Sequence, residues 1–119
     1  MKLFRLEAHG PLTVISPSAE VETLTETMLQ SEAERILKEL RAAPPRAVVI
    51  DLSQVRFFGS AFISVLLRIH KLIRLNGGKV VLAGAGERIT ELLQLTALNT
   101  LWTTFQNRAD ALAGLVDAE

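Results

Sequence analysis

The feature that most constrains the fold is a long apolar helix pattern flanked by two short apolar runs. Residues 47–50 read Ala-Val-Val-Ile with no polar residue between them, which is typical of a strand buried on both faces of a parallel sheet. Residues 60–76 are apolar on nearly every turn, a Gly-Gly pair ends that pattern, and residues 79–83 repeat the buried-strand pattern. A strand, a crossover helix and a returning parallel strand form a right-handed βαβ unit, so the sequence predicts an α/β fold.

Two strands and a helix are predicted before this unit. Residues 2–8 alternate apolar and charged side chains, as an edge strand with one solvated face does. A His-Gly-Pro turn then leads into a short strand over residues 12–16, so the two strands are expected to form an antiparallel hairpin. A helix is predicted over residues 22–41, ended by two prolines. Its apolar side is expected to comprise Leu24, Met28, Leu29, Ile36, Leu37 and Leu40.

Two helices and a last strand are predicted after the unit. Residues 87–95 are amphipathic, and residues 101–105 form an expected strand that carries the only tryptophan, Trp102, in a packing role. Asn107 is expected to cap a closing helix that runs through about residue 116. The expected packing stripe of that helix is Ala109, Leu112, Ala113 and Val116. Residues 1–119 therefore predict one domain with a mixed, mostly parallel sheet of four to five strands and four helices.

Composition argues against several classes of function. The chain carries 13 basic and 13 acidic residues, and a net charge of zero disfavours non-specific binding to nucleic acid or to an anionic membrane. It has no cysteine, so thiol catalysis and disulfides are excluded, and His9 and His70 are too few and too far apart to predict a metal site. The charged N-terminus and the lack of a ~20-residue apolar run favour a cytoplasmic protein. No cofactor is expected.

Ser60 stands where the loop after the first buried strand enters the long helix. In open α/β sheets functional groups gather beyond the carboxyl ends of the strands, and a helix N-terminus there offers unpaired N–H groups and the positive end of the dipole. The Ser60 hydroxyl is expected to cap the helix, with Gly59 giving the chain freedom to turn. A phosphate on the same oxygen would also lie in a site that favours anions, so position alone leaves both roles open.

A catalytic triad is not predicted. Ser60, His70 and Asp51 supply the residue types, but ten helical residues separate the serine from the histidine by roughly 15 Å. We therefore expect no enzymatic activity. His70 is expected at the edge of a basic stripe that includes Lys71 and Arg74, which is a solvated face or a contact for an acidic partner.

Residues 48–67, Val-Val-Ile-Asp-Leu-Ser-Gln-Val-Arg-Phe-Phe-Gly-Ser-Ala-Phe-Ile-Ser-Val-Leu-Leu, carry a family resemblance. Together with Gly-Gly-Lys-Val-Val-Leu at 77–82 and Leu-Leu-Gln-Leu-Thr-Ala-Leu at 92–98, they resemble the STAS domain of bacterial anti-sigma factor antagonists. In that family an Asp-Ser-Ser/Thr-Gly-Leu-Gly segment opens the helix, and a partner kinase phosphorylates its first serine. That serine corresponds to Ser60, so the resemblance implies a STAS-like fold and a phosphorylation site.

The residues around Ser60 depart from the family pattern. Gly59 replaces the aspartate, Ala61 replaces serine or threonine, and Phe62 and Ser64 replace the two glycines. Residues 16–21 also lack the Gly-x-Leu-Asp element that helps to form the partner surface in the family. Either the partner differs from the usual kinase, or the switch has been lost and the surface binds constitutively.

The resemblance implies partner switching. An unphosphorylated domain of this kind binds an anti-sigma factor or a GHKL-type serine kinase and so frees a sigma factor, and phosphorylation ends that contact. The expected partner-binding residues are Asp51, Arg56, Phe57, Phe58, Gly59, Ala61, Phe62 and Ser64. Weak homodimerisation stays open.

Two other functions remain open. One is a constitutive STAS scaffold or transporter-associated subunit without a phosphorylation switch. The other is a module that binds a small molecule or a nucleotide at the turn that begins with Gly84. That turn is a weak nucleotide signal, because Ile89 stands where the third glycine of a dinucleotide fingerprint would be needed.

Overall fold

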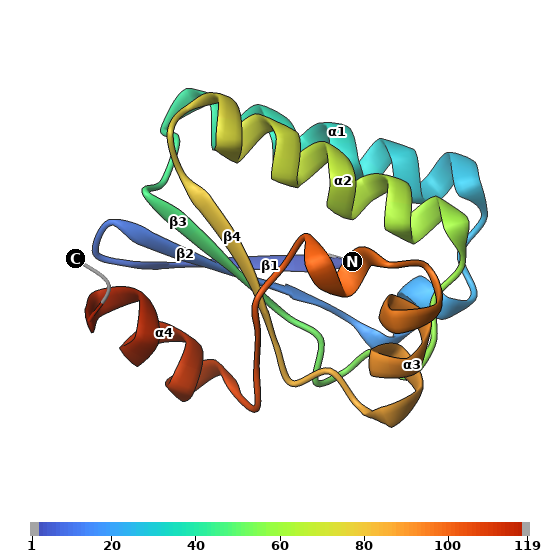
Figure 1. Ribbon diagram of the computed structural model, residues 1–119. Helices are drawn as coiled ribbons and strands as arrows, with labels where there is room; N and C mark the ends of the chain where they lie inside the picture. The colour runs from blue at the N-terminus through green and yellow to red at the C-terminus, as the bar shows by residue number, and fades with distance from the viewer. Residues whose placement is uncertain (1–2, 118–119) are drawn as a thin grey trace.

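The computed structural model describes residues 3–117, with side chains through Leu115, and shows an α/β fold built on one sheet (Figure 1). The strands are β1 (Phe4–His9), β2 (Leu12–Pro17), β3 (Ala47–Asp51), β4 (Lys79–Ala83) and β5 (Thr104–Phe105). The helices are α1 (Glu26–Ala42), α2 (Ser60–Leu75), α3 (Glu87–Leu95) and α4 (Arg108–Asp117), with short 3-10 turns η1 (Ala19–Glu22) and η2 (Leu98–Thr100). The predicted fold class, with four helices and a mixed sheet, is confirmed.

The strands lie in the order β1-β2-β3-β4-β5. The predicted hairpin of β1 and β2 is antiparallel, and the pairs β2–β3, β3–β4 and β4–β5 are parallel. All of β3 is buried, because Val48 and Ile50 belong to the core under α1 and α2 while Val49 belongs to the core under α4. Figure 1 shows this layering, with α1 and α2 side by side on one face of the sheet and α4 on the other. The unbroken apolar run of β3 therefore reflects two covered faces.

Helix α2 ends as the sequence predicts. Gly77 adopts the left-handed conformation, with a φ of 78°, that closes a helix without a Cβ clash. Gly78 is needed for a different reason, since a Cβ at that position would lie 2.7 Å from Cγ2 of Ile73. The chain can therefore turn tightly from α2 into β4.

Helix α1 begins later than predicted. Residues 19–22 form η1 instead, and α1 starts at Glu26 because the Thr25 hydroxyl accepts a hydrogen bond from the N–H of Met28 at 3.2 Å. The expected apolar side is correct at Leu29, Ile36, Leu37 and Leu40, which are buried. It is wrong at Met28, which is 51% exposed, and Leu24 precedes the helix and is half-buried.

The C-terminal elements also differ from the prediction. Strand β5 has two residues, and Trp102 lies in the turn before it, buried in the core as expected for a packing role. Asn107 caps α4, because its Oδ1 accepts a hydrogen bond from the N–H of Asp110 at 2.8 Å. The predicted packing stripe is correct in part: Leu112 packs against the core, but the buried residues of this helix are Ala111 and Leu115, which were not predicted. Ala109 and Ala113 are exposed, Leu112 is half-buried, and the Val116 side chain, like residue 2 of the predicted first strand, lies outside the described residues.

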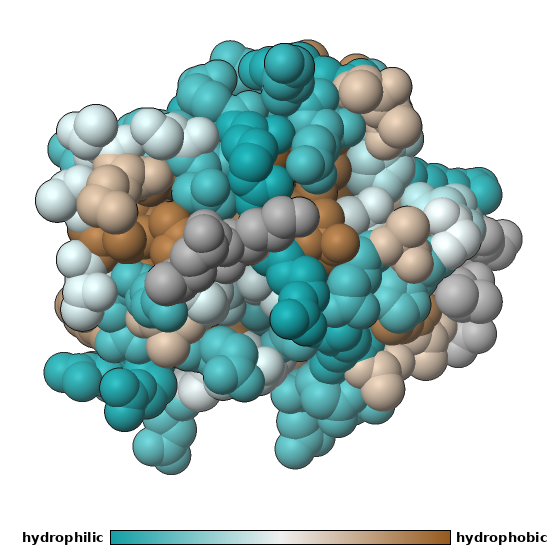
Figure 2. All heavy atoms as spheres, turned by 180° about the vertical axis from the view of Figure 1, so that it is seen from behind, coloured by the Kyte–Doolittle hydropathy of each residue, from teal (hydrophilic) through white to brown (hydrophobic). Residues whose placement is uncertain are grey.

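The surface is largely polar. In the view from behind, hydrophilic side chains dominate and hydrophobic ones are confined to separate patches (Figure 2). Within residues 3–117, none of the helices is both long enough and apolar enough to span a bilayer.

Candidate functional site

Ser60 is the first residue of α2 and is exposed to solvent. The residue at the N-cap position is Gly59, whose backbone is extended, and no side chain caps this helix. The expectation that the Ser60 hydroxyl caps α2 is therefore wrong. In the described part of the chain this hydroxyl makes no side-chain hydrogen bond, and it faces solvent at the end of the helix where N–H groups are unpaired.

An aromatic base, formed by Phe4, Phe58 and Phe62, lies beneath this helix entrance. The Phe62 ring lies 4.9 Å from the Phe58 ring and 6.1 Å from the Phe4 ring, measured between centroids, and all three side chains are buried. Phe58 and Phe62 were expected to contact a partner, but both point into the core. The bulk of Phe62, which replaces a family glycine, therefore does not crowd Ser60.

The exposed residues around Ser60 form a mixed aromatic and basic surface. Phe57 is 42% exposed, and the guanidinium carbon of Arg88, from α3, lies 5.3 Å from the centre of its ring. Arg56 is exposed and lies 3.8 Å from the carboxylate of Glu22, which also accepts a hydrogen bond from its N–H. We call this the Ser60 surface. It comprises the exposed residues Arg56, Phe57, Gly59, Ser60, Ser64 and Arg88 and the half-buried Ala61.

Arg88 and Glu22 are contributions to this surface that the sequence did not reveal. Arg88 is 31 residues from Phe57 along the chain, and Glu22 is 34 residues from Arg56. No motif or spacing connects either pair, because the contacts depend on how α3 and η1 pack beside the loop after β3.

Asp51 is buried and is not one of the exposed residues of the Ser60 surface. It is 7% exposed, its Oδ1 accepts a hydrogen bond from the N–H of Ser53, and its Oδ2 accepts one from Nε of Arg108 at 3.0 Å. Arg108 also donates to Ser16 at 2.7 Å and to Glu7 at 3.3 Å. The structure therefore places Asp51 in a hydrogen-bond network that joins β1, β2, β3 and the start of α4.

A polar cavity of about 370 Å³ adjoins this network. It is lined by Arg5, Ser16, Pro17, Ser18, Asp51, Ser53, Gln54 and Arg108. The donors of Arg108 are already engaged by Asp51, Ser16 and Glu7, so this arginine is held in place by the protein itself.

The turn at Gly84, considered as a nucleotide-binding position, packs against the same network. Gly84 has a φ of 70°, and a Cβ there would lie 3.2 Å from Oδ1 of Asp51 and 3.1 Å from Cβ of Ser53. Both the backbone conformation and this close approach require glycine. The glycine is thus explained by packing of the protein against itself.

Replacing Gly84 with alanine is expected to lower the free energy of unfolding by about 1.5 kcal/mol, because a Cβ is disfavoured in the left-handed region and crowds Ser53. Urea unfolding followed by circular dichroism measures the change. Gly86→Ala is the matched control, since a Cβ at Gly86 meets no atom within 4 Å and its φ is negative. Equal losses for the two variants would contradict this account.

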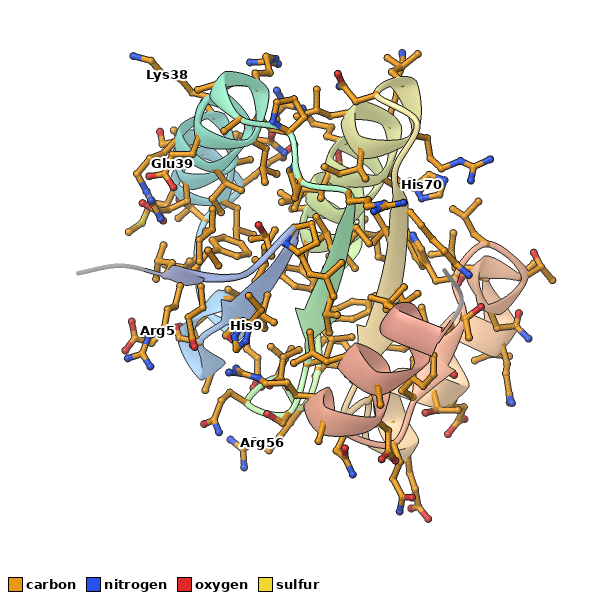
Figure 3. All side chains as sticks on the ribbon, turned by 90° about the vertical axis from the view of Figure 1, so that its left-hand side faces the viewer. Arg5, His9, Lys38, Glu39, Arg56 and His70 are labelled. Atoms are coloured by element: carbon orange, nitrogen blue, oxygen red, sulfur yellow. The ribbon has the colours of Figure 1, made fainter. Side chains whose placement is uncertain are left out.

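Ser60, His70 and Asp51 are not brought together. The indole N–H of Trp102 donates to Nδ1 of His70 at 3.1 Å, and Asp51 is paired with Arg108. Figure 3 shows His70 in the upper half of the view, beside α2, and Arg56, which belongs to the Ser60 surface, in the lower part. The Ser60 surface is thus an exposed surface that includes a serine without a side-chain hydrogen bond.

Comparison with known proteins gives a consistent picture. The family model described as the STAS domain matches residues 4–111. An anti-sigma F factor antagonist of Paenibacillus polymyxa is 22% identical over 110 residues, which are 92% of each chain. The anti-sigma-F factor antagonist RsfB of Mycobacterium tuberculosis is 29% identical over 107 residues, covering 90% of this chain and 84% of that protein.

Solved structures share the fold over nearly the whole chain. An anti-sigma-factor antagonist (STAS) domain protein from Planctomyces limnophilus is 34% identical with a TM-score of 0.81, covering 95% of this chain and 97% of that one. The anti-sigma factor antagonist SpoIIAA in its unphosphorylated form has a TM-score of 0.80 over 96% of each chain. Because it is only 14% identical, this second likeness concerns the fold alone.

Proposed function

The chain belongs to the STAS domain family, and from that premise we propose that it is an anti-sigma factor antagonist controlled by phosphorylation. Its Ser60 surface binds an anti-sigma factor or a GHKL-type serine kinase. Phosphorylation of Ser60 ends that binding. The observation that carries the proposal is the exposed Ser60 hydroxyl beside the exposed Phe57.

The surface has the composition of a protein-binding site. An aromatic side chain such as Phe57, flanked by arginines, is the kind of residue that is enriched at the centres of protein interfaces. The aromatic base holds the backbone beneath it, so the surface is preorganised and little ordering is required on binding. The neighbours of Ser60, Gly59 and Ala61, have no side chain or a small one, which leaves the hydroxyl accessible to a kinase.

A phosphate on Ser60 would act on the complex rather than on the fold. The first turn of α2 presents unpaired N–H groups and the positive end of the helix dipole, so it tolerates an added negative charge. At the interface, the same charge must lose its hydration shell and repels any carboxylate of the partner. The modified domain is therefore expected to stay folded and to lose its partner.

Replacing Ser60 with aspartate is expected to weaken partner binding at least tenfold, which is about 1.4 kcal/mol, while Ser60→Ala keeps the affinity of the unmodified chain. Calorimetry with a cognate anti-sigma factor measures both affinities. Ser31→Asp is the matched control, because Ser31 is an exposed serine of α1 outside the Ser60 surface. Incubation with the kinase and ATP, followed by mass spectrometry, locates the phosphate.

The outcomes separate the proposal from the constitutive scaffold. Equal affinities of Ser60→Asp and Ser60→Ala would remove Ser60 from the mechanism. Partner binding that persists through the Ser60 surface with no phosphorylation by any cognate kinase would favour a scaffold without a switch.

A further inference from the structure

A second feature of the molecule lies far from the Ser60 surface, at the amino end of β4. A pocket of about 210 Å³, which we call the amino-end pocket, is lined by His70, Arg74, Lys79, Val80, Leu101 and Thr103. Figure 3 shows His70 on the side of α2 that faces away from α1. A pocket of this volume admits several water molecules or a small polyatomic ion.

The tautomer of His70 is fixed by the protein. The indole N–H of Trp102, which is buried, donates to Nδ1 of His70 at 3.1 Å. Because Nδ1 accepts this hydrogen bond, the neutral imidazole must carry its proton on Nε2. His70 therefore presents a donor at its other nitrogen whether it is neutral or protonated.

Two of the side chains that line the pocket with His70 are cationic. Arg74 and Lys79 form no ion pair with any residue in the described range, and no acidic side chain lines the pocket. Burial, followed by the charge of Arg74, lowers the pKa of His70 below its ordinary value. Arg74 also interacts favourably with the dipole at the C-terminal end of α2, and Lys79 is the exposed first residue of β4. Together the two side chains make the pocket positively charged.

The backbone N–H of Val80 points toward the edge of β4 at which the pocket lies. The N–H groups of Leu82 and Gly84 donate to Thr103 and Phe105, so alternate residues of β4 direct their N–H groups toward β5. Val80 has the same direction as Leu82, but β5 begins only at Thr104, which is the partner of Leu82. Within the described chain no strand therefore pairs with Val80 at this edge.

We propose that the amino-end pocket binds a phosphate-type oxyanion, either inorganic phosphate or the phosphate of a small monoester. Nε2 of His70, the side chains of Arg74 and Lys79, the N–H of Val80 and the hydroxyl of Thr103 are its donors. Five donor groups from residues that line one pocket can serve the several acceptor oxygens of such an ion, and charged donors make the strongest of these bonds. Leu101, which is 41% exposed, gives the pocket an apolar side chain that the organic part of a monoester could contact.

Proton NMR of the two histidines tests this site on the intact chain. Addition of inorganic phosphate is expected to raise the pKa of His70 by at least half a unit in a saturable manner, because a bound anion stabilises the imidazolium. His9 is an internal control, since it is exposed and lies in the β1–β2 hairpin outside the pocket. A parallel titration with phosphoserine distinguishes the free ion from a monoester, and sodium chloride at matched ionic strength corrects for screening.

Variants assign the effect to the pocket. Lys79→Gln and Arg74→Gln are each expected to weaken the apparent phosphate affinity at least fivefold, whereas Arg41→Gln, an exposed arginine of α1, leaves it unchanged. Circular dichroism checks that each variant is folded. Equal shifts of His9 and His70, or a His70 shift that persists in Lys79→Gln and Arg74→Gln, would show an adventitious ion only and overturn the proposal.

Discussion

Replacing Phe62 with alanine is expected to lower the free energy of unfolding by about 4 kcal/mol, because it removes a fully buried ring and leaves a cavity. The ring is 1% exposed and contacts both Phe58 and Phe4, so the surrounding core cannot collapse freely into the space. Urea unfolding followed by circular dichroism measures the loss. Since a domain of this size is stable by only about 5–15 kcal/mol, the variant is expected to be close to unfolding at 37 °C.

Phe57→Ala is the matched control, because it removes the same side chain from the same segment but from the surface. Phe57 is 42% exposed, and the Arg88 guanidinium lies over its ring. Its removal is therefore expected to change the free energy of unfolding by less than about 1 kcal/mol. Under the proposed function the same change weakens partner binding. Similar losses of stability in the two variants would contradict the assignment of Phe62 to the core and Phe57 to the surface.

Phe57 and Phe62 show what could not be predicted from the sequence at this site, namely which aromatic side chains are buried. The position of Ser60 at the helix entrance followed from the strand, loop and helix patterns on either side of it. The run of apolar residues around Ser60 did not reveal which rings turn inward, because the loop from Leu52 to Gly59 has no regular period. Phe4, which stacks on Phe62, is 58 residues away and could not be linked to it from one sequence.

The central βαβ unit was predictable for the opposite reason. Strands covered on both faces carry unbroken apolar runs. The bounds predicted for β3 and β4 from such runs therefore agree with the structure to within one residue. The two strands pair in parallel, with Val48 opposite Val80. Helix α4 is buried on one side only and is rich in alanine. Several sets of its residues at helical spacing could therefore form the buried face. Tertiary contact with the sheet decides among them, and it selects Ala111 and Leu115.

The start of α1 depended on which of two possible N-cap residues begins the helix, and the apolar spacing of the sequence could not decide between them. Ser18 and Thr25 are both capable caps, and both are used, one for η1 and one for α1. The predicted helix began at residue 22, the last residue of η1, because its apolar side was extended back to Leu24, which precedes α1. The consequence for function is that η1 brings Glu22 to the N–H of Arg56, beside the Ser60 surface.

Asp51 is the clearest case of a residue whose partner lies beyond local reasoning. The resemblance placed it among the partner-binding residues, whereas the structure pairs it with Arg108, 57 residues away. Arg108 connects this carboxylate with Glu7 and Ser16, so it ties the start of α4 to three strands. A network of this kind positions one layer of the fold relative to another.

Replacing Arg108 with methionine is expected to lower the free energy of unfolding by about 3 kcal/mol, because it leaves the Asp51 carboxylate without its guanidinium partner. The Asp51 side chain is only 10% exposed, and the single N–H of Ser53 does not satisfy both of its oxygens. Arg108→Lys is expected to recover only part of the loss, since an ammonium cannot reproduce the fork that reaches Asp51, Ser16 and Glu7.

A double-mutant cycle with Asp51→Asn separates the ion pair from the rest of the network. In the Arg108→Met background the asparagine is expected to cost less than it does alone, because the carboxylate it replaces is already unpaired there. Thermal or urea unfolding of the four chains gives the coupling energy, which we expect to be about 1–2 kcal/mol. Additive losses would mean that Asp51 and Arg108 stabilise the fold independently. Partner affinity that fell with Asp51→Asn but not with Arg108→Met, at equal stability, would instead return Asp51 to the binding surface.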